Sequence, residues 1–211
     1  MSSASDGAPV AQPLSFAFTA ENVIKAKAII AKYPPGRQAS AVLPLLDLAQ
    51  RQHDNWLPRA AMDVVAEMLD LARIRVYEIA TFYTMFNLKP VGKYLLQICT
   101  TTPCWLRGSD EVVKACEKKL GIHVGESTAD GQFSTMEVEC LGGCVNAPII
   151  QVNDDFYEDL DAASTEALLD ALRRGAPPPV GSVRKRQGSA PEGGKTTLKD
   201  IAVTGDPNAR G

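Results

Sequence analysis

Four cysteines in two close pairs constrain this chain more than any other feature of its sequence. One pair lies in Cys99-Thr-Thr-Thr-Pro-Cys104 and the other lies in Cys140-Leu-Gly-Gly-Cys144. Each pair follows a stretch that is typical of a β-strand, and 35 residues separate the two pairs. Two pairs of thiolates that folding brings together form the ligand set of a soft metal centre, either zinc or an iron–sulfur cluster.

The spacing of the cysteines leaves both metals open. A [2Fe–2S] cluster needs two thiolates on each iron, which two short loops at strand ends can present. Gly142 and Gly143 allow a tight turn that aims N–H groups at sulfur, and the threonines at 100–102 offer further donors. Structural zinc sites use similar spacings, so a zinc-stabilised interaction module is an alternative. A redox dithiol is less favoured because the chain has no C-x-x-C motif.

The remaining cysteine and the two histidines are not expected to bind a metal. Cys116 shares one face of a predicted helix at 109–120 with Val112, so we interpret it as a small buried apolar residue. His53 and His123 lie far from the cysteine pairs in the sequence, and we interpret them as surface or core residues.

Composition excludes several classes of protein. Five cysteines without an apolar export signal argue against a disulfide framework, and no apolar run is long enough to span a bilayer. A net charge of −3 gives no reason to expect general nucleic-acid binding. The chain also lacks a Gly-x-Gly-x-x-Gly fingerprint for a dinucleotide and an evident nucleophile–base pair, so no catalytic residue is predicted.

The first part of the chain is expected to form a flexible arm at 1–19 and a helical bundle at 20–88. Ser40 is predicted to cap the second helix of this bundle. Short helices joined by tight turns favour a docking domain. A helix-turn-helix DNA-binding module is the alternative, but the bundle lacks a basic recognition face. The apolar spacing predicts four helices, at 21–33, 40–53, 58–69 and 74–83.

Residues 89–175 have the pattern of a small mixed sheet with helices packed against it. The helices are expected to begin with Ser109 and Ser164 as capping residues. The whole chain is therefore predicted to belong to the α+β class. The predicted strands lie at 93–98, 133–139 and 148–153 with a further one from 156, and the predicted helices lie at 109–120 and 164–174.

The end of the chain differs in charge from the rest. Residues 176–211 hold six Lys or Arg and three Asp or Glu, whereas the whole chain carries a net charge of −3. An acidic body with a basic extended tail is consistent with a tail that lies on a partner. A solvated tail without a partner is the alternative.

Three stretches of the sequence closely resemble the NuoE family, the small [2Fe–2S] subunit of the NADH-oxidising arm of respiratory complex I. The resemblance covers about residues 20–175, and the stretch 186–194 is similar to an extension found in alphaproteobacterial and mitochondrial members. The three stretches are Ala80-Thr-Phe-Tyr-Thr-Met-Phe-Asn-Leu-Lys-Pro90, Ile98-Cys-Thr-Thr-Thr-Pro-Cys104 and Glu139-Cys-Leu-Gly-Gly-Cys-Val-Asn-Ala-Pro148.

This resemblance implies a thioredoxin-like ferredoxin domain after the helical bundle. It also implies that Cys99 and Cys104 bind one iron of a [2Fe–2S] cluster, and that Cys140 and Cys144 bind the other. The implied activity is one-electron transfer within NADH:quinone oxidoreductase. The FMN and the NADH site are then expected on a larger flavoprotein partner and not on this chain.

The resemblance further implies where the chain works and what it contacts. The expected location is the cytoplasmic side of the bacterial inner membrane, or the matrix side in a mitochondrion, without membrane insertion. The bundle at 20–88 is expected to dock on the flavoprotein subunit, and the tail at 176–211 on a neighbouring subunit of the peripheral arm. The same module also serves as a diaphorase subunit in NAD-linked formate dehydrogenases and hydrogenases, which is the closest alternative function.

Overall fold

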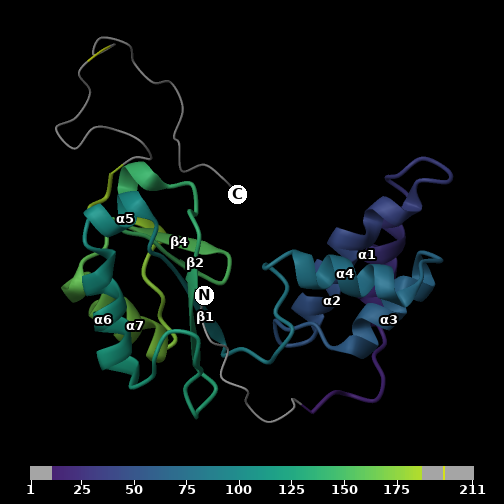
Figure 1. Cartoon of the computed structure of the whole chain (residues 1–211), viewed down its shortest axis with the longest axis horizontal. Helices are drawn as coiled ribbons and strands as arrows, with labels where there is room; N and C mark the ends of the chain where they lie inside the picture. The colour runs from purple at the N-terminus through teal and green to yellow at the C-terminus, as the bar shows by residue number, and fades with distance from the viewer. Residues whose placement is uncertain (1–10, 187–196, 198–211) are drawn as a thin grey trace. The chain divides into compact units, whose positions relative to one another are not determined.

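The computed structural model describes residues 11–186 and residue 197. The chain divides into two compact units between Lys93 and Tyr94. We call the part up to Lys93 the helical unit and the part from Tyr94 the sheet unit (Figure 1). The sequence prediction placed the boundary after residue 88.

The helical unit contains each of the four predicted helices. The hydroxyl of Thr19 accepts a hydrogen bond from the backbone N–H of Asn22 at 3.2 Å and so caps the first helix. Leu45, Leu46 and Val65 are fully buried in the apolar core of this unit. The elements are α1 (Ala20–Ile30), the 3₁₀ turn η1 (Gln38–Ala41), α2 (Val42–Gln52), α3 (Arg59–Met68) and α4 (Arg73–Phe82).

The predicted cap at Ser40 is wrong. Ser40 lies inside η1, and its backbone N–H donates to the carbonyl of Arg37 at 3.1 Å. The next helix, α2, begins at Val42 and has no side-chain cap. The 3₁₀ turn runs directly into α2 and so takes the place of a capping side chain.

Part of the predicted arm at 1–19 packs against the helical unit. Phe16 and Phe18 contact its apolar core. The side-chain amide of Gln52 donates to the carbonyl of Ala17 at 2.8 Å, and its oxygen accepts from the backbone N–H of Thr19 at 3.0 Å. Residues 11–19 are therefore docked on the helices, whereas residues 1–10 lie outside the described part of the chain.

The described part of the sheet unit contains five strands in one sheet, in the order β2-β1-β3-β4-β5. The pairs β1–β2 and β4–β5 are parallel and the other two pairs are antiparallel. Figure 1 shows α6 and α7 side by side along the sheet. The elements are β1 (Tyr94–Cys99), α5 (Thr102–Leu106), α6 (Ser109–Leu120), β2 (Phe133–Val138), the 3₁₀ turn η2 (Cys144–Asn146), β3 (Ile150–Val152), β4 (Asp155–Glu158), α7 (Ala162–Arg173) and β5 (Gly181–Ser182).

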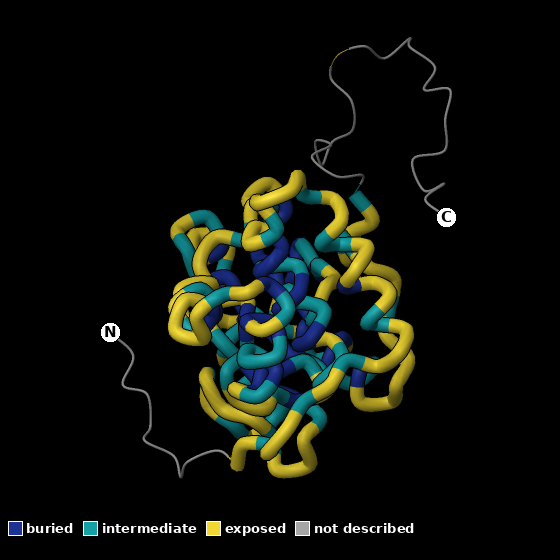
Figure 2. The backbone as a smooth tube through the Cα atoms, turned by 90° about the vertical axis from the view of Figure 1, so that its right-hand side faces the viewer, coloured by how far each residue is buried: buried dark blue, intermediate teal, exposed yellow. Residues whose placement is uncertain are grey.

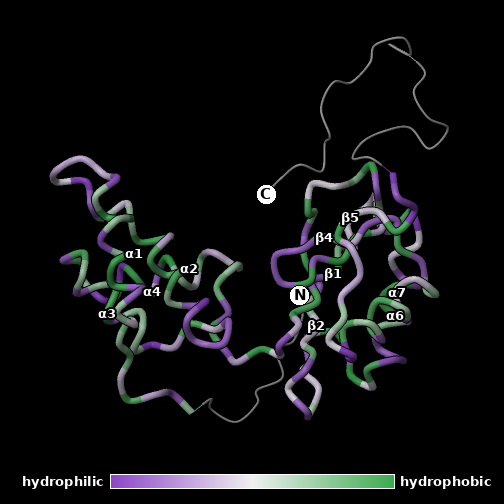
Figure 3. Tube along the Cα trace, turned by 180° about the vertical axis from the view of Figure 1, so that it is seen from behind, coloured by the Kyte–Doolittle hydropathy of each residue, from purple (hydrophilic) through white to green (hydrophobic). Residues whose placement is uncertain are grey.

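The main apolar core of the sheet unit lies between the sheet and its helices. Leu96 and Ile98 of β1 pack in this core with Leu169 of α7. Cys116 is fully buried in it, which confirms that this cysteine serves as an apolar core residue. Figure 2 shows buried positions surrounded by exposed turns, and Figure 3 shows the apolar stretches within the helices and strands. The prediction of the α+β class is confirmed.

Two further predicted caps are corrected by the structure. Gly108 precedes α6 with a φ of 95°, and Ser109 is the first helical residue, buried and not a cap. At α7 the capping residue is Asp161, whose carboxylate accepts from the backbone N–H of Ser164 at 2.8 Å. The Ser164 hydroxyl in turn accepts from the backbone N–H of Asp161 at 2.8 Å, which completes a capping box.

The sheet continues into the segment that was predicted to be an extended tail from residue 176. Strand β5 pairs in parallel with β4, with Tyr157 opposite Gly181 and Glu158 opposite Ser182. The rest of that segment, residues 187–211 apart from residue 197, lies outside the described part of the chain. Among the described residues, no helix has the length and apolar character needed to cross a bilayer.

Candidate metal centre

The sheet topology brings the two cysteine pairs to one edge. Strands β1 and β2 are adjacent and parallel, so their carboxyl ends lie at the same edge of the sheet. Cys99 ends β1 directly opposite Val138, the last residue of β2, and Cys140 follows two residues later. Cys104 lies on α5, which follows β1, and Cys144 begins η2, which leads into β3 on the other side of β1.

The first pair is buried at this edge. Cys99 and Cys104 are each 1% exposed and form a small cluster with Ala147. Leu141, which lies between the two cysteines of the second pair, packs against this cluster. The prediction of an open loop between Cys99 and Cys104 is wrong, because α5 begins at Thr102 and carries Cys104.

The second pair lies on the surface in a glycine-containing turn. The sulfur atoms of Cys140 and Cys144 are 3.3 Å apart, and both residues are exposed. The backbone N–H of Gly142 donates to the sulfur of Cys140 at 3.4 Å. Gly142 has a φ of 84°, which favours glycine, and a Cβ on Gly143 would lie 2.6 Å from Cδ1 of Ile149. The turn therefore favours glycine at 142 through its backbone conformation, and a side chain at 143 would require Ile149 to move.

The neighbouring threonines do not all face sulfur. The hydroxyl of Thr101 lies 3.3 Å from the sulfur of Cys99. The hydroxyl of Thr100 instead donates to the carboxylate of Glu137 on β2. Thr101 is thus the residue of this run that supplies a hydroxyl beside the first pair.

In the first pair the two thiols have opposite pKa shifts. Burial is the largest single influence on Cys99 and raises its pKa, but hydrogen bonds from Thr101, Cys104 and the Leu141 N–H together lower it below the ordinary value. Burial, and secondarily the neighbouring Cys99, raises the pKa of Cys104 to about 12. Cys99 is therefore the sulfur that is more easily deprotonated.

The two thiols of the second pair also have opposite pKa shifts. The N–H of Gly142, and next the thiol of Cys144, lower the pKa of Cys140. The hydrogen bond to Cys140 is the largest influence on Cys144 and raises its pKa. In each pair one thiol is thus more easily deprotonated than the other, and a bound metal would take the place of the protons on both.

The donor set fits a centre that takes two sulfur ligands at each of two positions. The sulfurs are grouped in two pairs, and Leu141 joins the loops that carry them. In the part of the chain that the structure describes, no three His, Cys, Asp or Glu side chains surround the position of one ion. His123 is 84% exposed and paired with Glu117, and the ring of His53 packs on Trp56 with centroids 4.8 Å apart. Neither histidine belongs to the cysteine group.

An ion pair beside the second cysteine pair was missed by the sequence analysis. Arg186 donates to both carboxylate oxygens of Asp159, at 3.0 Å and 2.5 Å. The Asp159 side chain is 1% exposed and the Arg186 side chain is 17% exposed. The two residues are far apart in the sequence and no sequence motif links them. The sequence therefore indicated Arg186 only as one positive charge of the basic tail.

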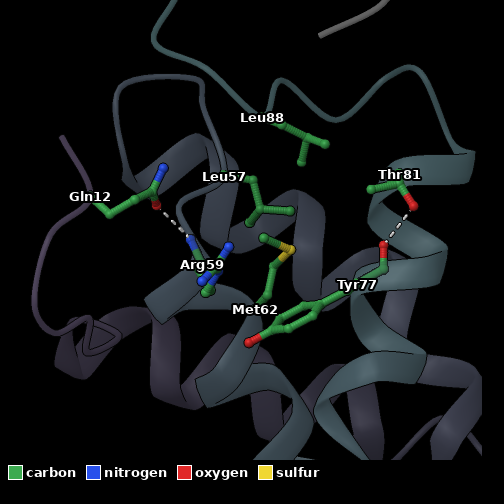
Figure 4. A pocket seen from close by; sticks show the side chains of 7 residues that line it. All are labelled: Gln12, Leu57, Arg59, Met62, Tyr77, Thr81 and Leu88. Carbon is green, nitrogen blue, oxygen red and sulfur yellow. Dashed lines mark hydrogen bonds between the residues drawn. The ribbon is translucent and has the colours of Figure 1, made fainter. Parts of the chain in front are cut away.

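The helical unit contains a hollow of about 240 Å³ (Figure 4). Its apolar wall includes Leu57 and Met62, and its polar residues include Arg59 and Tyr77. The backbone N–H of Arg59 donates to the side chain of Gln12 at 3.0 Å. The hollow holds no cysteine or histidine and provides no metal site.

Comparison with known proteins places the chain in a family. Residues 26–173 match the model of the family described as thioredoxin-like [2Fe-2S] ferredoxin. The chain belongs to the thioredoxin-like [2Fe-2S] ferredoxins. The matched range includes most of the helical unit as well as the sheet unit, and it contains all four paired cysteines. The predictions of this family and of a [2Fe–2S] cofactor are confirmed.

Two relatives are named as an NADH-quinone oxidoreductase subunit and an NADH dehydrogenase flavoprotein. A subunit of the NADH-quinone oxidoreductase of Rickettsia bellii is 59% identical over 159 residues, which cover 75% of this chain and 95% of that protein. The mitochondrial NADH dehydrogenase [ubiquinone] flavoprotein 2 of Dictyostelium discoideum is 52% identical over 188 residues, which cover 89% of this chain and 76% of that protein.

A solved structure of the same fold is part of a different enzyme. A chain of the air-oxidized NAD+-reducing [NiFe]-hydrogenase is similar with a TM-score of 0.55 and 23% identity. The match covers 63% of this ferredoxin but only 23% of the hydrogenase chain. At this level of identity the similarity concerns the fold alone.

Proposed function

We propose that this ferredoxin is the one-electron carrier subunit of an NADH:quinone oxidoreductase. In this proposal Cys99 and Cys104 bind one iron of its [2Fe–2S] cluster, and Cys140 and Cys144 bind the other. The observation that carries the assignment is the convergence of the two cysteine pairs at the shared carboxyl edge of β1 and β2. The names of relatives that are 52–59% identical support the choice of complex.

The four cysteines form a buried half and an exposed half of the proposed site. When bound, a [2Fe–2S] cluster supplies one-electron redox chemistry. Cys99 and Cys104 would hold it on the buried side, where α5 and Leu141 exclude water. Cys140 and Cys144 would hold it on the exposed side, facing a partner. The N–H of Gly142 and the hydroxyl of Thr101 lie against sulfur, and such donors favour the more negative, reduced state.

The partner in this proposal is a flavoprotein subunit that carries FMN and the NADH site. Trp105, Leu106 and Val145 are large exposed apolar residues next to Cys104 and Cys144, and they supply a docking surface beside the cluster. Ile74, Phe82 and Met85 are similarly exposed on the helical unit, in keeping with a docking role for residues 20–88.

The proposal also covers the place of the chain in the complex. It works in the peripheral arm, on the cytoplasmic side of the bacterial inner membrane or on the matrix side of a mitochondrion. The tail at 176–211 contacts a neighbouring subunit of that arm. The related alternative is a diaphorase subunit of an NAD-linked hydrogenase or formate dehydrogenase.

Two measurements test the proposed function. The chain is purified anaerobically, and its metal content, visible absorption and low-temperature EPR spectrum after dithionite reduction are recorded. We expect a red-brown protein with about two irons per chain and a signal from one unpaired electron, as a [2Fe–2S] cluster requires. A colourless protein with about one zinc per chain would instead support a zinc-stabilised interaction module. The catalytic subunit that co-purifies with the native protein separates complex I from a hydrogenase or formate dehydrogenase.

A further inference from the structure

The exposed cysteine pair lies on a segment with little burial of its own. Cys140 and Cys144 are exposed, and η2, which begins at Cys144, is a single 3₁₀ turn. The first pair, by contrast, is held by burial at the end of β1 and in α5. Another contact is therefore needed to hold the second turn in place.

Arg186 supplies such a contact. Its Nη2 atom donates to the backbone carbonyl of Val145 at 2.9 Å, and Val145 directly follows Cys144. The same guanidinium holds the buried carboxylate of Asp159 with two hydrogen bonds. Arg186 thus joins the turn of the second cysteine pair to the residue that follows β4.

Other hydrogen bonds tie the same turn to β4. The backbone N–H of Asp159 donates to the carbonyl of Asn146 at 2.7 Å, and the side-chain amide of Asn146 donates to Glu158 at 2.6 Å. The hydroxyl of Ser182 donates to Asp159 at 2.5 Å. Asp159 therefore lies at the centre of a network that includes both the cysteine turn and β5.

The backbone around Arg186 is itself fixed on the sheet. Val183 donates its N–H to the carbonyl of Glu158 at 3.1 Å, and Lys185 donates to the carbonyl of Ser182 at 2.9 Å. The N–H of Arg186 lies 3.3 Å from the hydroxyl of Ser182. The guanidinium thus extends from an anchored turn and not from a free chain end.

We infer that Arg186 is a positioning residue, which holds the turn of Cys140 and Cys144 in the geometry that binds the cluster. The inference rests on the proposed function, because it takes Cys144 as a ligand of iron. It assigns a role inside this chain to residues 181–186, which belong to the segment predicted to be an extended tail. Contact with a neighbouring subunit is then left to the residues beyond 186.

The test compares Arg186→Ala, Arg186→Lys and Lys185→Ala in the full-length protein with its cluster. Lys185 is exposed and adjacent, so its variant removes the same charge without touching the network. The rate of iron release to a chelator, the reduction potential and the EPR spectrum are measured well below the unfolding temperature. We expect Arg186→Ala to release iron roughly 10–100-fold faster and to shift the EPR signal, as loss of a residue that orients ligands does. Lys185→Ala should behave as wild type.

Arg186→Lys separates geometry from charge. A lysine keeps the positive charge but lacks the planar fork that reaches Asp159 and Val145 together, so its iron release should lie between wild type and Arg186→Ala. Iron release and EPR spectra in Arg186→Ala that equal those of wild type, even with a lower unfolding temperature, would overturn the inference and leave a structural ion pair.

A second variant keeps the test informative if Arg186→Ala does not fold. The double variant Asp159→Asn/Arg186→Gln leaves no buried unpaired charge. Faster iron release in this variant supports the inference, and a wild-type rate overturns it. A wild-type chain that contains zinc or no iron would instead overturn the proposed function, so the two failures are distinguishable.

Discussion

The two units of this ferredoxin use buried polar groups very differently. Among the described residues, Gln50 is the buried polar residue of the helical unit. The sheet unit buries six polar or charged residues: Ser109, Ser134, Thr135, Asn146, Asp159 and Thr165. Two of them, Asn146 and Asp159, belong to the network around the turn of the second cysteine pair. The helical unit is thus held mainly by apolar packing, and the sheet unit also depends on polar contacts that position loops.

Because of this difference, mutations in the two units are expected to have different effects on stability and on the cluster. A buried polar group that loses its partner costs free energy and also releases the segment that it held. A cavity in an apolar core mainly lowers the free energy of unfolding. We therefore expect core mutations in the helical unit to change stability alone, and mutations at the cysteine edge to change the cluster.

The largest expected effect is at the cysteines. Cys144→Ser should lose most of the cluster or alter its EPR spectrum, because a hydroxyl is a harder and poorer ligand for iron than a thiolate. Cys116→Ala is the matched control, since Cys116 is fully buried in the apolar core and has no role in the site. Iron content and EPR of both variants provide the measurement. A wild-type spectrum in Cys144→Ser would contradict the ligand assignment.

The next effect concerns the apolar core of the helical unit. Leu45 is 0% exposed, so Leu45→Ala should lower the free energy of unfolding by about 2–5 kcal/mol through lost burial and a cavity. Leu14→Ala, at a fully exposed position, should change it by less than about 0.5 kcal/mol. Unfolding in urea, followed by circular dichroism, measures both. An altered EPR spectrum in folded Leu45→Ala would show that the two units are not separable in this way.

The smallest expected effect is the contribution of Asp159 to the pH dependence of the free energy of unfolding. Burial is the largest single influence on its pKa and raises it, but hydrogen bonds from Arg186 and Ser182, together with the charge of Arg186, hold the pKa below the ordinary carboxyl value. A lowered folded-state pKa adds stability above the unfolded-state pKa, and this stability is lost as the pH falls through the folded-state value.

Asp159→Asn should therefore cost about 1.5–3 kcal/mol at neutral pH, the range for hydrogen bonds to a charged group. The cost should stay constant down to about pH 4 and shrink only below it. Urea unfolding across a pH series measures this cost, with Asp70→Asn on the surface of the helical unit as the control. A cost that grew as the pH fell would contradict the assigned direction of the shift.

Much of the architecture could be predicted from local patterns. Apolar spacing located the helices α1 to α4, but the first of them was predicted to run to residue 33 and ends at Ile30. The helix α5 was missed, because three threonines followed by a proline resemble a loop and the helix is only five residues long. The caps at Ser109 and Ser164 were misplaced, because Gly108 precedes α6 without a side-chain cap and Asp161 caps α7.

The sequence by itself showed two close cysteine pairs with glycines in the second turn, and its resemblance to a known family gave the family. These features depend on neighbours in the chain, so local stretches of sequence contain them. Only the tertiary structure decided that one pair is buried and the other exposed, and that Arg186 joins Asp159 and Val145. Those contacts arise from strand pairing between segments that are distant in the sequence. The residues next to Arg186 in the sequence therefore do not indicate which side chains it will contact in the folded protein.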